Sequence, residues 1–137
     1  MKEVQKLKDF FIGYRIASLW STSDDKNESE FLDELYSIDD FNHETKKAME
    51  LDCIKFMGSN KDDLETYADE ITYNIHESLS AYEIAGHDFW LNRNGHGCGF
   101  WDRRGLNQET GERLSEASKA FNECHLYVGD DNQIHMM

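Results

Sequence analysis

Residues 87–103 constrain the fold of this chain more than any other stretch, because they hold two of its three tryptophans and three of its nine glycines. They read His-Asp-Phe-Trp-Leu-Asn-Arg-Asn-Gly-His-Gly-Cys-Gly-Phe-Trp-Asp-Arg, so two aromatic segments flank a glycine-rich centre. Aromatic side chains favour β-strands. Asn94 and Gly95 at the centre are typical of a tight hairpin turn, which needs positive φ angles. The stretch therefore predicts a β-hairpin.

Two registers of this hairpin are open. In the preferred one, a two-residue turn pairs Phe89 with Phe100 and His87 with Asp102, and these side chains share one face of the ribbon. The opposite face then carries two indoles and three polar side chains: Asp88, Trp90, Asn92, Trp101 and Arg103. A four-residue loop would instead pair the two tryptophans. Exposed indoles would also suit a homodimer interface.

The hairpin offers candidates for acid–base chemistry and for ligand binding. A histidine beside a carboxylate is the minimal acid–base unit, so the catalytic interpretation uses His87, His96 and Asp102. The structural interpretation, which we prefer, is that His87 and Asp102 close the open end of the hairpin by a hydrogen bond. A ligand-binding pocket would draw on the polar and aromatic side chains of the stretch: Asp88, Trp90, Arg93, Asn94, His96, Trp101 and Arg103.

The cysteines and histidines indicate neither a metal site nor a nucleophile. Their spacing matches none of the usual metal-binding motifs, so we predict no metal and no other cofactor. Cys98 falls opposite Leu91 on the apolar face, where a core cysteine is expected rather than a reactive one. An odd number of cysteines, three, is typical of reduced thiols in a cytoplasm.

The charge of the chain is strongly negative and uneven. The net charge is −14, and residues 21–86 alone hold eighteen acidic and five basic groups. Such a surface repels nucleic-acid phosphates, which excludes direct nucleic-acid binding, and it attracts basic proteins. Solubility alone is the simpler explanation of an acidic surface. No apolar run approaches the roughly 20 residues that span a bilayer, and the basic start lacks the pattern of a signal peptide.

Helical periodicity predicts four helices, from about residues 2–20, 42–57, 60–79 and 108–122. The third displays an acidic ridge that would bind a basic partner, formed by Asp62, Asp63, Glu65, Asp69, Glu70 and Glu77. Alternating residues at 124–128 and 134–136 predict a second hairpin around the turn residues 129–132.

Together these elements predict a single α+β domain over residues 1–137. Residues 2–86 form its mainly helical, acidic part. Residues 87–137 form a hairpin–helix–hairpin part, which would build one antiparallel sheet of about four strands with helices packed on one face.

The stretch from His87 to Arg103 resembles a motif of small proteins encoded by bacteriophages and other mobile elements, which reads His-Asp-Phe-Trp-Leu-Thr-Arg-Asn-Gly-His-Gly-Ala-Gly-Phe-Trp-Asp-Arg. The likeness continues through residues 127–131, and a looser likeness lies in the N-terminal helix. Here Asn92 replaces threonine and Cys98 replaces alanine, and a family with alanine there would not use a cysteine nucleophile. That family has no established activity, so the resemblance implies a phage context rather than a reaction.

These observations favour an accessory phage protein that binds and modulates a host or anti-phage-defence protein in the bacterial cytoplasm, through a DNA-like negative surface. This function needs no catalysis. The first alternative is a ligand-binding or hydrolytic pocket within residues 87–103. The second is a structural or assembly role as a homo-oligomer.

Overall fold

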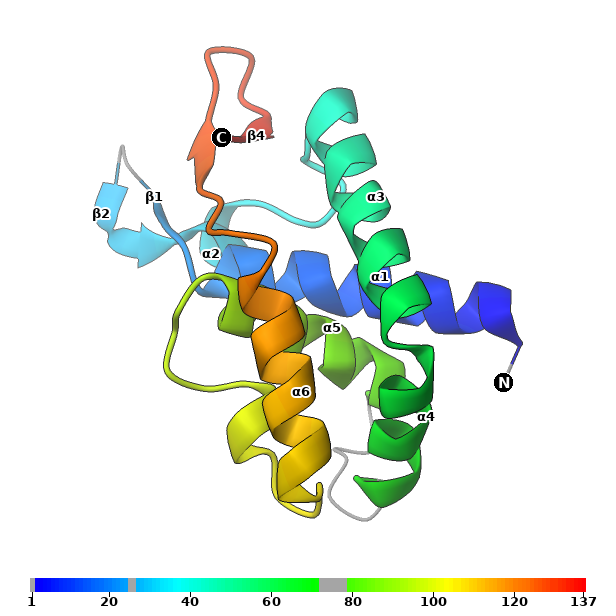
Figure 1. Cartoon of the computed structure of the whole chain (residues 1–137). Helices are drawn as coiled ribbons and strands as arrows, with labels where there is room; N and C mark the ends of the chain where they lie inside the picture. The colour runs from blue at the N-terminus through cyan, green and yellow to red at the C-terminus, as the bar shows by residue number, and fades with distance from the viewer. Residues whose placement is uncertain (1, 25–26, 72–78) are drawn as a thin grey trace.

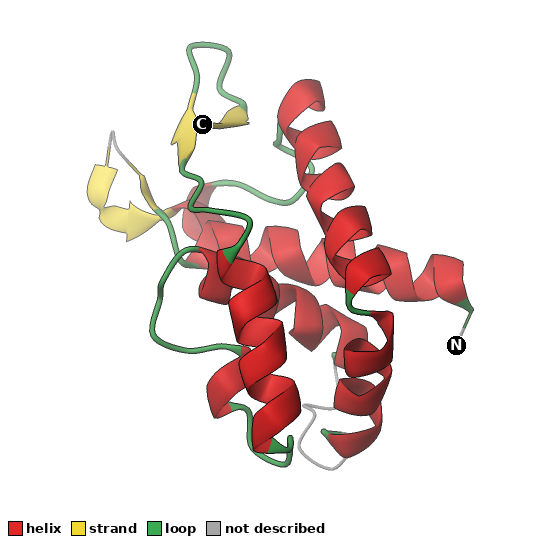
Figure 2. Ribbon diagram, viewed as in Figure 1, coloured by secondary structure: helices red, strands yellow, loops and turns green. Residues whose placement is uncertain are grey.

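A computed structural model describes residues 2–24, 27–71 and 79–137, and most of these residues are helical (Figures 1 and 2). The helices are α1 (Glu3–Trp20), α2 (Leu32–Leu35), α3 (His43–Ser59), α4 (Lys61–Glu70), α5 (Ala81–Arg93) and α6 (Gln108–Lys119), with a 3₁₀ turn, η2 (Phe100–Asp102). The strands are β1 (Ser23–Asp24), β2 (Asn27–Phe31), β3 (Leu126–Val128) and β4 (Ile134–Met136).

The strands form two separate antiparallel pairs within the described residues, β1 with β2 and β3 with β4. The mixed α+β class is thus consistent with the prediction, but the single sheet of about four strands is wrong. The β3–β4 hairpin confirms the predicted C-terminal hairpin and sets Tyr127 opposite His135. It projects from the helical body beside the start of α3 (Figure 1), where the Ile134 amide donates to the Asp40 carbonyl at 2.8 Å.

The predicted central hairpin is also wrong, because residues 87–93 belong to α5. This helix starts with a capping box, in which the Ser80 hydroxyl accepts from the Glu83 amide and the Glu83 carboxylate accepts from the Ser80 amide. It ends in a Schellman motif, in which the amides of His96 and Gly95 donate to the carbonyls of Leu91 and Asn92 at 3.1 and 3.3 Å. None of the predicted cross-strand pairs can form.

Gly95 explains why the sequence pattern was ambiguous. It has a φ of +67°, a left-handed conformation that suits both a type I′ hairpin turn and the residue after a helix end. In this chain the Asn94-Gly95 pair ends a helix, and the loop after it leads to η2.

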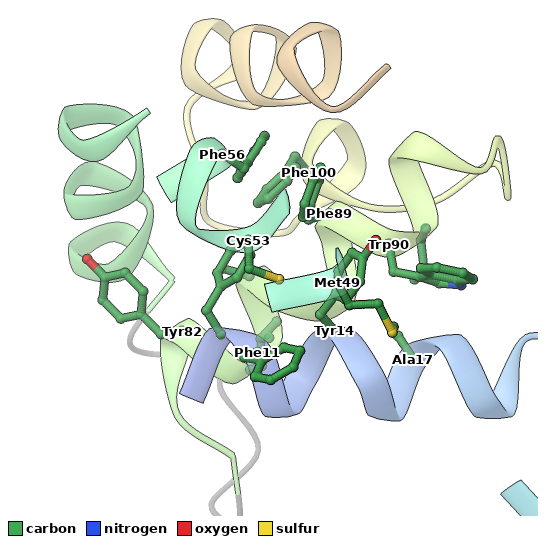
Figure 3. Close-up of a cluster of buried hydrophobic side chains, with 14 of the residues drawn as sticks. Phe11, Tyr14, Ala17, Met49, Cys53, Phe56, Tyr82, Phe89, Trp90 and Phe100 are labelled. Atoms are coloured by element: carbon green, nitrogen blue, oxygen red, sulfur yellow. The ribbon is translucent and has the colours of Figure 1, made fainter. Parts of the chain in front are cut away.

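Helices α1 and α5 lie against each other at unusually short distance. A β-carbon added at Gly13 would lie 1.8 Å from the carbonyl oxygen of Glu83, and one added at Gly86 would lie 2.0 Å from that of Phe10. The backbones therefore touch directly, which only glycine permits. This contact holds α5 against α1 and so places Phe89 of α5 in the aromatic core, where its ring stacks on that of Phe56 with centroids 4.1 Å apart (Figure 3).

The other helices largely follow the prediction. The side chains of Asn42 and Asn107 accept from the amides of Thr45 and Thr110 and so start α3 and α6. Helix α4 is shorter than predicted, since it ends at Glu70 with a buried Ile71 behind it. The remainder of the predicted helix up to residue 78 lies outside the described residues. Among the helices that the structure describes, none combines the length and the apolar character needed to cross a bilayer.

Candidate functional site

Arg93, predicted to contact a ligand, is a structural hub. Its guanidinium donates to the Tyr14 hydroxyl at 2.9 Å and to the Asp52 carboxylate at 2.8 Å. It also donates to the carbonyl oxygens of Phe121 and Asn122 at 2.8 and 2.9 Å. The side chain thereby joins α1, α3 and the segment after α6 to α5, and these hydrogen bonds use its donors inside the fold.

Asp88 is fully buried and is used in the same way. Its carboxylate accepts from the Tyr67 hydroxyl at 2.8 Å, and from two nitrogens of the Arg103 guanidinium, with Nε at 3.1 Å. Burial raises the pKa of the Asp88 carboxyl, and the hydrogen bonds from Arg103 and Tyr67 oppose this rise. The pair fastens the segment after η2 to α5 and α4.

The two asparagines of the stretch hold its loop in place. The Asn92 side-chain oxygen accepts from the Phe100 amide at 2.7 Å, and the Asn94 side-chain oxygen accepts from the Cys124 amide at 2.8 Å. Gly99 has a φ of +139°, which favours glycine, and a β-carbon there would also lie 2.3 Å from the Asn92 side-chain oxygen. These contacts fix the conformation of the loop that connects α5 to η2.

His87, His96 and Asp102 do not form an acid–base unit, since no hydrogen bond joins them in the described part of the chain. The Asp102 carboxylate accepts from the Gly99 amide at 2.9 Å, and His96 is exposed in the loop. The predicted His87–Asp102 contact is therefore wrong. Burial also raises the pKa of the Cys98 thiol, and Asp102 and Asp88 add to this rise, which makes that thiol a poor nucleophile.

His87 is the least satisfied polar side chain of the stretch. Its Nε2 atom is buried and has no hydrogen-bond partner within the described residues. The rings of His87 and Trp20 are neighbours, with centroids 6.2 Å apart. Burial and the positive charge of Arg103 lower its pKa to about 4. His87 is therefore neutral in the folded protein at neutral pH.

We expect His87 to make stability depend on pH. Its pKa of about 4 lies below the ordinary value of 6.5, so the unfolded chain takes up the proton first and the free energy of unfolding falls as the pH drops from 7 to 4.5. The difference between the two pKa values corresponds to about 3 kcal/mol at full effect. Urea unfolding of wild type and His87→Phe at both pH values measures this contribution.

His43→Phe is the matched control, because His43 is exposed at the start of α3. The His43 variant should keep the pH dependence of the wild type, and the His87 variant should lose that part of it. Equal pH dependence of wild type and His87→Phe would contradict the assignment.

The two indoles of the stretch do not share a surface. Trp90 is buried, and its Nε1 atom donates to the Ser21 hydroxyl at 2.8 Å, whereas Trp101 is 54% exposed. The predicted face that carries both indoles is wrong, because it required a strand. A homodimer interface built on both tryptophans is therefore no longer supported.

The predicted acidic ridge is partly used inside the fold. Asp62, Glu65 and Asp69 are exposed on α4. Asp63 forms an ion pair with Arg113 of α6 at 2.9 Å, and Glu70 accepts from the backbone and side-chain amides of Asn107 at 2.7–2.9 Å. Glu77 lies outside the described residues.

Helix α6 adds an acidic surface that sequence reasoning missed. Glu109, Glu112 and Glu116 are exposed and spaced by three and four residues, which puts them on one side of the helix. A hollow of about 580 Å³ lies between α4 and α6, lined by Asn60, Asp63, Glu109, Glu112, Arg113 and Glu116. We call this surface the acidic hollow. The spacing of the glutamates could have revealed it, but the near-neutral sum for residues 87–137 concealed it.

Three residues of the predicted ligand set, Trp90, Asn94 and His96, do line one cleft. Its volume is about 500 Å³, and it is completed by segments remote in sequence: Ser21, Thr22, Ser23, Cys124, His125, Leu126, Tyr127 and Met137. We call it the polar cleft. Asp88, Arg93, Trp101 and Arg103 are not among the residues that line it.

Comparison of the chain with protein-family models, curated proteins and solved structures finds no significant match. The resemblance to phage proteins thus stays a prediction.

Proposed function

We propose that this protein acts by binding rather than by catalysis, and that the acidic hollow and the adjoining exposed carboxylates of α4 bind a protein with a basic surface. The observation that carries the proposal is the composition of the hollow, where four carboxylates surround a single guanidinium. That guanidinium, Arg113, is paired with Asp63, so the three glutamates of α6 keep their charge available.

Electrostatics favours a cationic partner at this surface. Carboxylates gathered on one surface give it a negative potential, and complementary charge speeds the encounter with a basic protein. Exposed Asp62, Glu65 and Asp69 extend the same sign of charge along α4. The phage resemblance extends the proposal to a host or defence protein in the bacterial cytoplasm, for which rows of carboxylates would imitate DNA phosphates.

The polar side chains of residues 87–103 support a binding role over a catalytic one, because several of them already form hydrogen bonds inside the fold. Asp88, Arg93 and Asp102 all have partners inside the fold. A hydrolytic centre would need a nucleophile, a base and an orienting group within hydrogen-bond reach. The described part of the chain assembles no such set from the predicted residues.

The test compares two triple variants that change the net charge equally. The first carries Glu109→Gln, Glu112→Gln and Glu116→Gln in the acidic hollow. The second carries Asp33→Asn, Glu34→Gln and Asp39→Asn, three exposed carboxylates on and after α2. Immobilised wild-type protein captures partners from a bacterial host lysate at low salt, and the affinity of each recovered partner is then measured for all three proteins.

We expect a basic partner whose binding weakens with salt, because exposed charges are screened beyond about 8 Å at physiological ionic strength. The hollow variant should bind it at least about tenfold more weakly, or about 1.4 kcal/mol for three lost charge contacts. The α2 variant should bind as the wild type does. Recovery of no salt-sensitive basic partner, or equal loss in both variants, would overturn the proposal.

A further inference from the structure

The polar cleft has the features of a small-molecule site, and we propose that it binds a small organic anion, a carboxylate or a phosphate monoester carried on an apolar group. This inference is independent of the proposed protein partner, because the cleft and the acidic hollow share no lining residue. Four segments build it: residues 21–23 after α1, the end of α5 with the Schellman loop after it, residues 124–127 at the start of β3, and Met137 after β4.

Hydrogen bonds between these segments fix the shape of the cleft. The Trp90 indole donates to the Ser21 hydroxyl at 2.8 Å, which joins α5 to the end of α1. The Asn94 side chain accepts from the Cys124 amide at 2.8 Å, which joins the loop to the start of the last hairpin. The Met137 amide donates to the carbonyl of His125, also at 2.8 Å. A cleft with walls held this way loses little freedom when a ligand binds.

Five polar side chains of the cleft make no hydrogen bond within the described part of the fold, although the ring of Tyr127 stacks on that of His135. These side chains, for which the described residues offer no hydrogen-bond partner, are those of Thr22, Ser23, His96, His125 and Tyr127. They supply three hydroxyl groups and two imidazoles, all of which can donate to an anionic oxygen. The fold thus brings His96 of residues 87–103 together with four donors from other segments at one opening.

The lining of the polar cleft is free of acidic side chains that would repel an anion. None of the residues that line the polar cleft is Asp, Glu, Lys or Arg, although 28 of the 137 residues are acidic. An anion placed there is met by neutral donors of the lining. The Glu123 carboxylate lies nearby but outside the lining, with its Oε1 atom 3.7 Å from the position of a β-carbon on Gly95. The negative charge elsewhere on the protein is screened by salt.

The apolar residues of the lining favour a ligand that carries an apolar group. Trp90, Cys124, Leu126 and Met137 give the cleft an apolar side, which favours an aromatic or aliphatic group next to the anionic one. The volume of about 500 Å³ falls within the range of about 300–1,000 Å³ that is usual for small-molecule sites.

The experiment is an NMR titration of the full chain with phenyl phosphate and with benzoate, and with phenol as the neutral analogue. We expect saturable shifts at the amides of His96 and His125 and at the indole N–H of Trp90 with at least one anion, and none with phenol. Which anion binds more tightly identifies the phosphate or the carboxylate as the preferred group. Equal binding of phenol, or no saturation with either anion up to about 10 mM, would overturn the proposal.

Variants locate the site. The double variant His96→Ala/His125→Ala removes two exposed donors and should fold normally, and we expect it to bind at least tenfold more weakly. His43→Ala, an exposed histidine on α3, should bind as the wild type does. Unchanged binding by the folded double variant, or shifts that map to the acidic hollow instead, would contradict the assignment.

Discussion

Replacing Gly86 by alanine is expected to lower the free energy of unfolding by about 3 kcal/mol, the upper end of the usual cost of overpacking. The new β-carbon would lie 2.0 Å from the Phe10 carbonyl oxygen and 2.7 Å from the Tyr14 amide nitrogen. Both are backbone atoms of α1, so no side chain can move aside and the two helices must separate. Urea unfolding, followed by tryptophan fluorescence, measures the loss.

Gly58→Ala is the matched control, because the same substitution should there have the opposite sign. Gly58 lies in α3, and its added β-carbon would meet no atom within 4 Å. Alanine in a helix is about 0.5–1 kcal/mol more stable than glycine, so this variant should be slightly stabilised. Equal stability of wild type and the Gly86 variant would show that α1 and α5 do not touch as described.

Replacing Asp88 by alanine should cost about 3–5 kcal/mol, the usual penalty for removing one partner of a buried ion pair. The carboxylate is fully buried, and its loss leaves the partly buried Arg103 guanidinium and the Tyr67 hydroxyl without their acceptor. Thermal unfolding should show a large drop in midpoint.

Asp102→Ala separates the effect of burial from the effect of charge. Asp102 is exposed and accepts one hydrogen bond from the Gly99 amide, so its loss should cost only about 1 kcal/mol. An Asp88 variant no less stable than the Asp102 variant would refute the structural role of the buried pair.

The helices that show a clear apolar periodicity and have capping residues at their ends could be predicted from the sequence. Helices α1, α3 and α6 follow from apolar periodicity, and Asn42 and Asn107 mark two of their starts with side-chain caps that the structure contains. The C-terminal hairpin follows from its alternating pattern and turn residues. The β1–β2 pair was missed, because its polar, acidic sequence is typical of a loop.

Residues 87–103 could not be predicted correctly, since two local signals compete there. Phenylalanine, tryptophan and Asn94-Gly95 favour a hairpin, but Ser80 and Glu83 form a capping box upstream. Tyr82, Gly86 and Phe89 are spaced by four and three residues, which places them on one face of a helix. Contact with α1 through Gly86 decides the outcome, and such long-range packing overrides strand propensity.

The candidate sites likewise depend on long-range packing that the sequence pattern does not reveal. Sequence patterns identified many of the polar residues that matter, but burial determines whether a side chain supports the fold or meets a ligand. Asp88 and Arg93 turned inward, whereas His96 stayed exposed. Other residues that line the polar cleft together with His96, such as Ser23 and His125, are distant from it in the sequence. No local sequence pattern links them to His96.

Helix α5 runs through Arg93 and ends at Asn94, and this helix determines where the side chains of residues 87–103 lie. Backbone NMR of the full chain tests it directly, through carbon secondary shifts and nuclear Overhauser effects. We predict helical shifts over residues 81–93, contacts between protons three residues apart, and a left-handed Gly95. Strand-like shifts over residues 87–93, with α-proton contacts across to residues 96–102, would contradict the fold and both proposed sites.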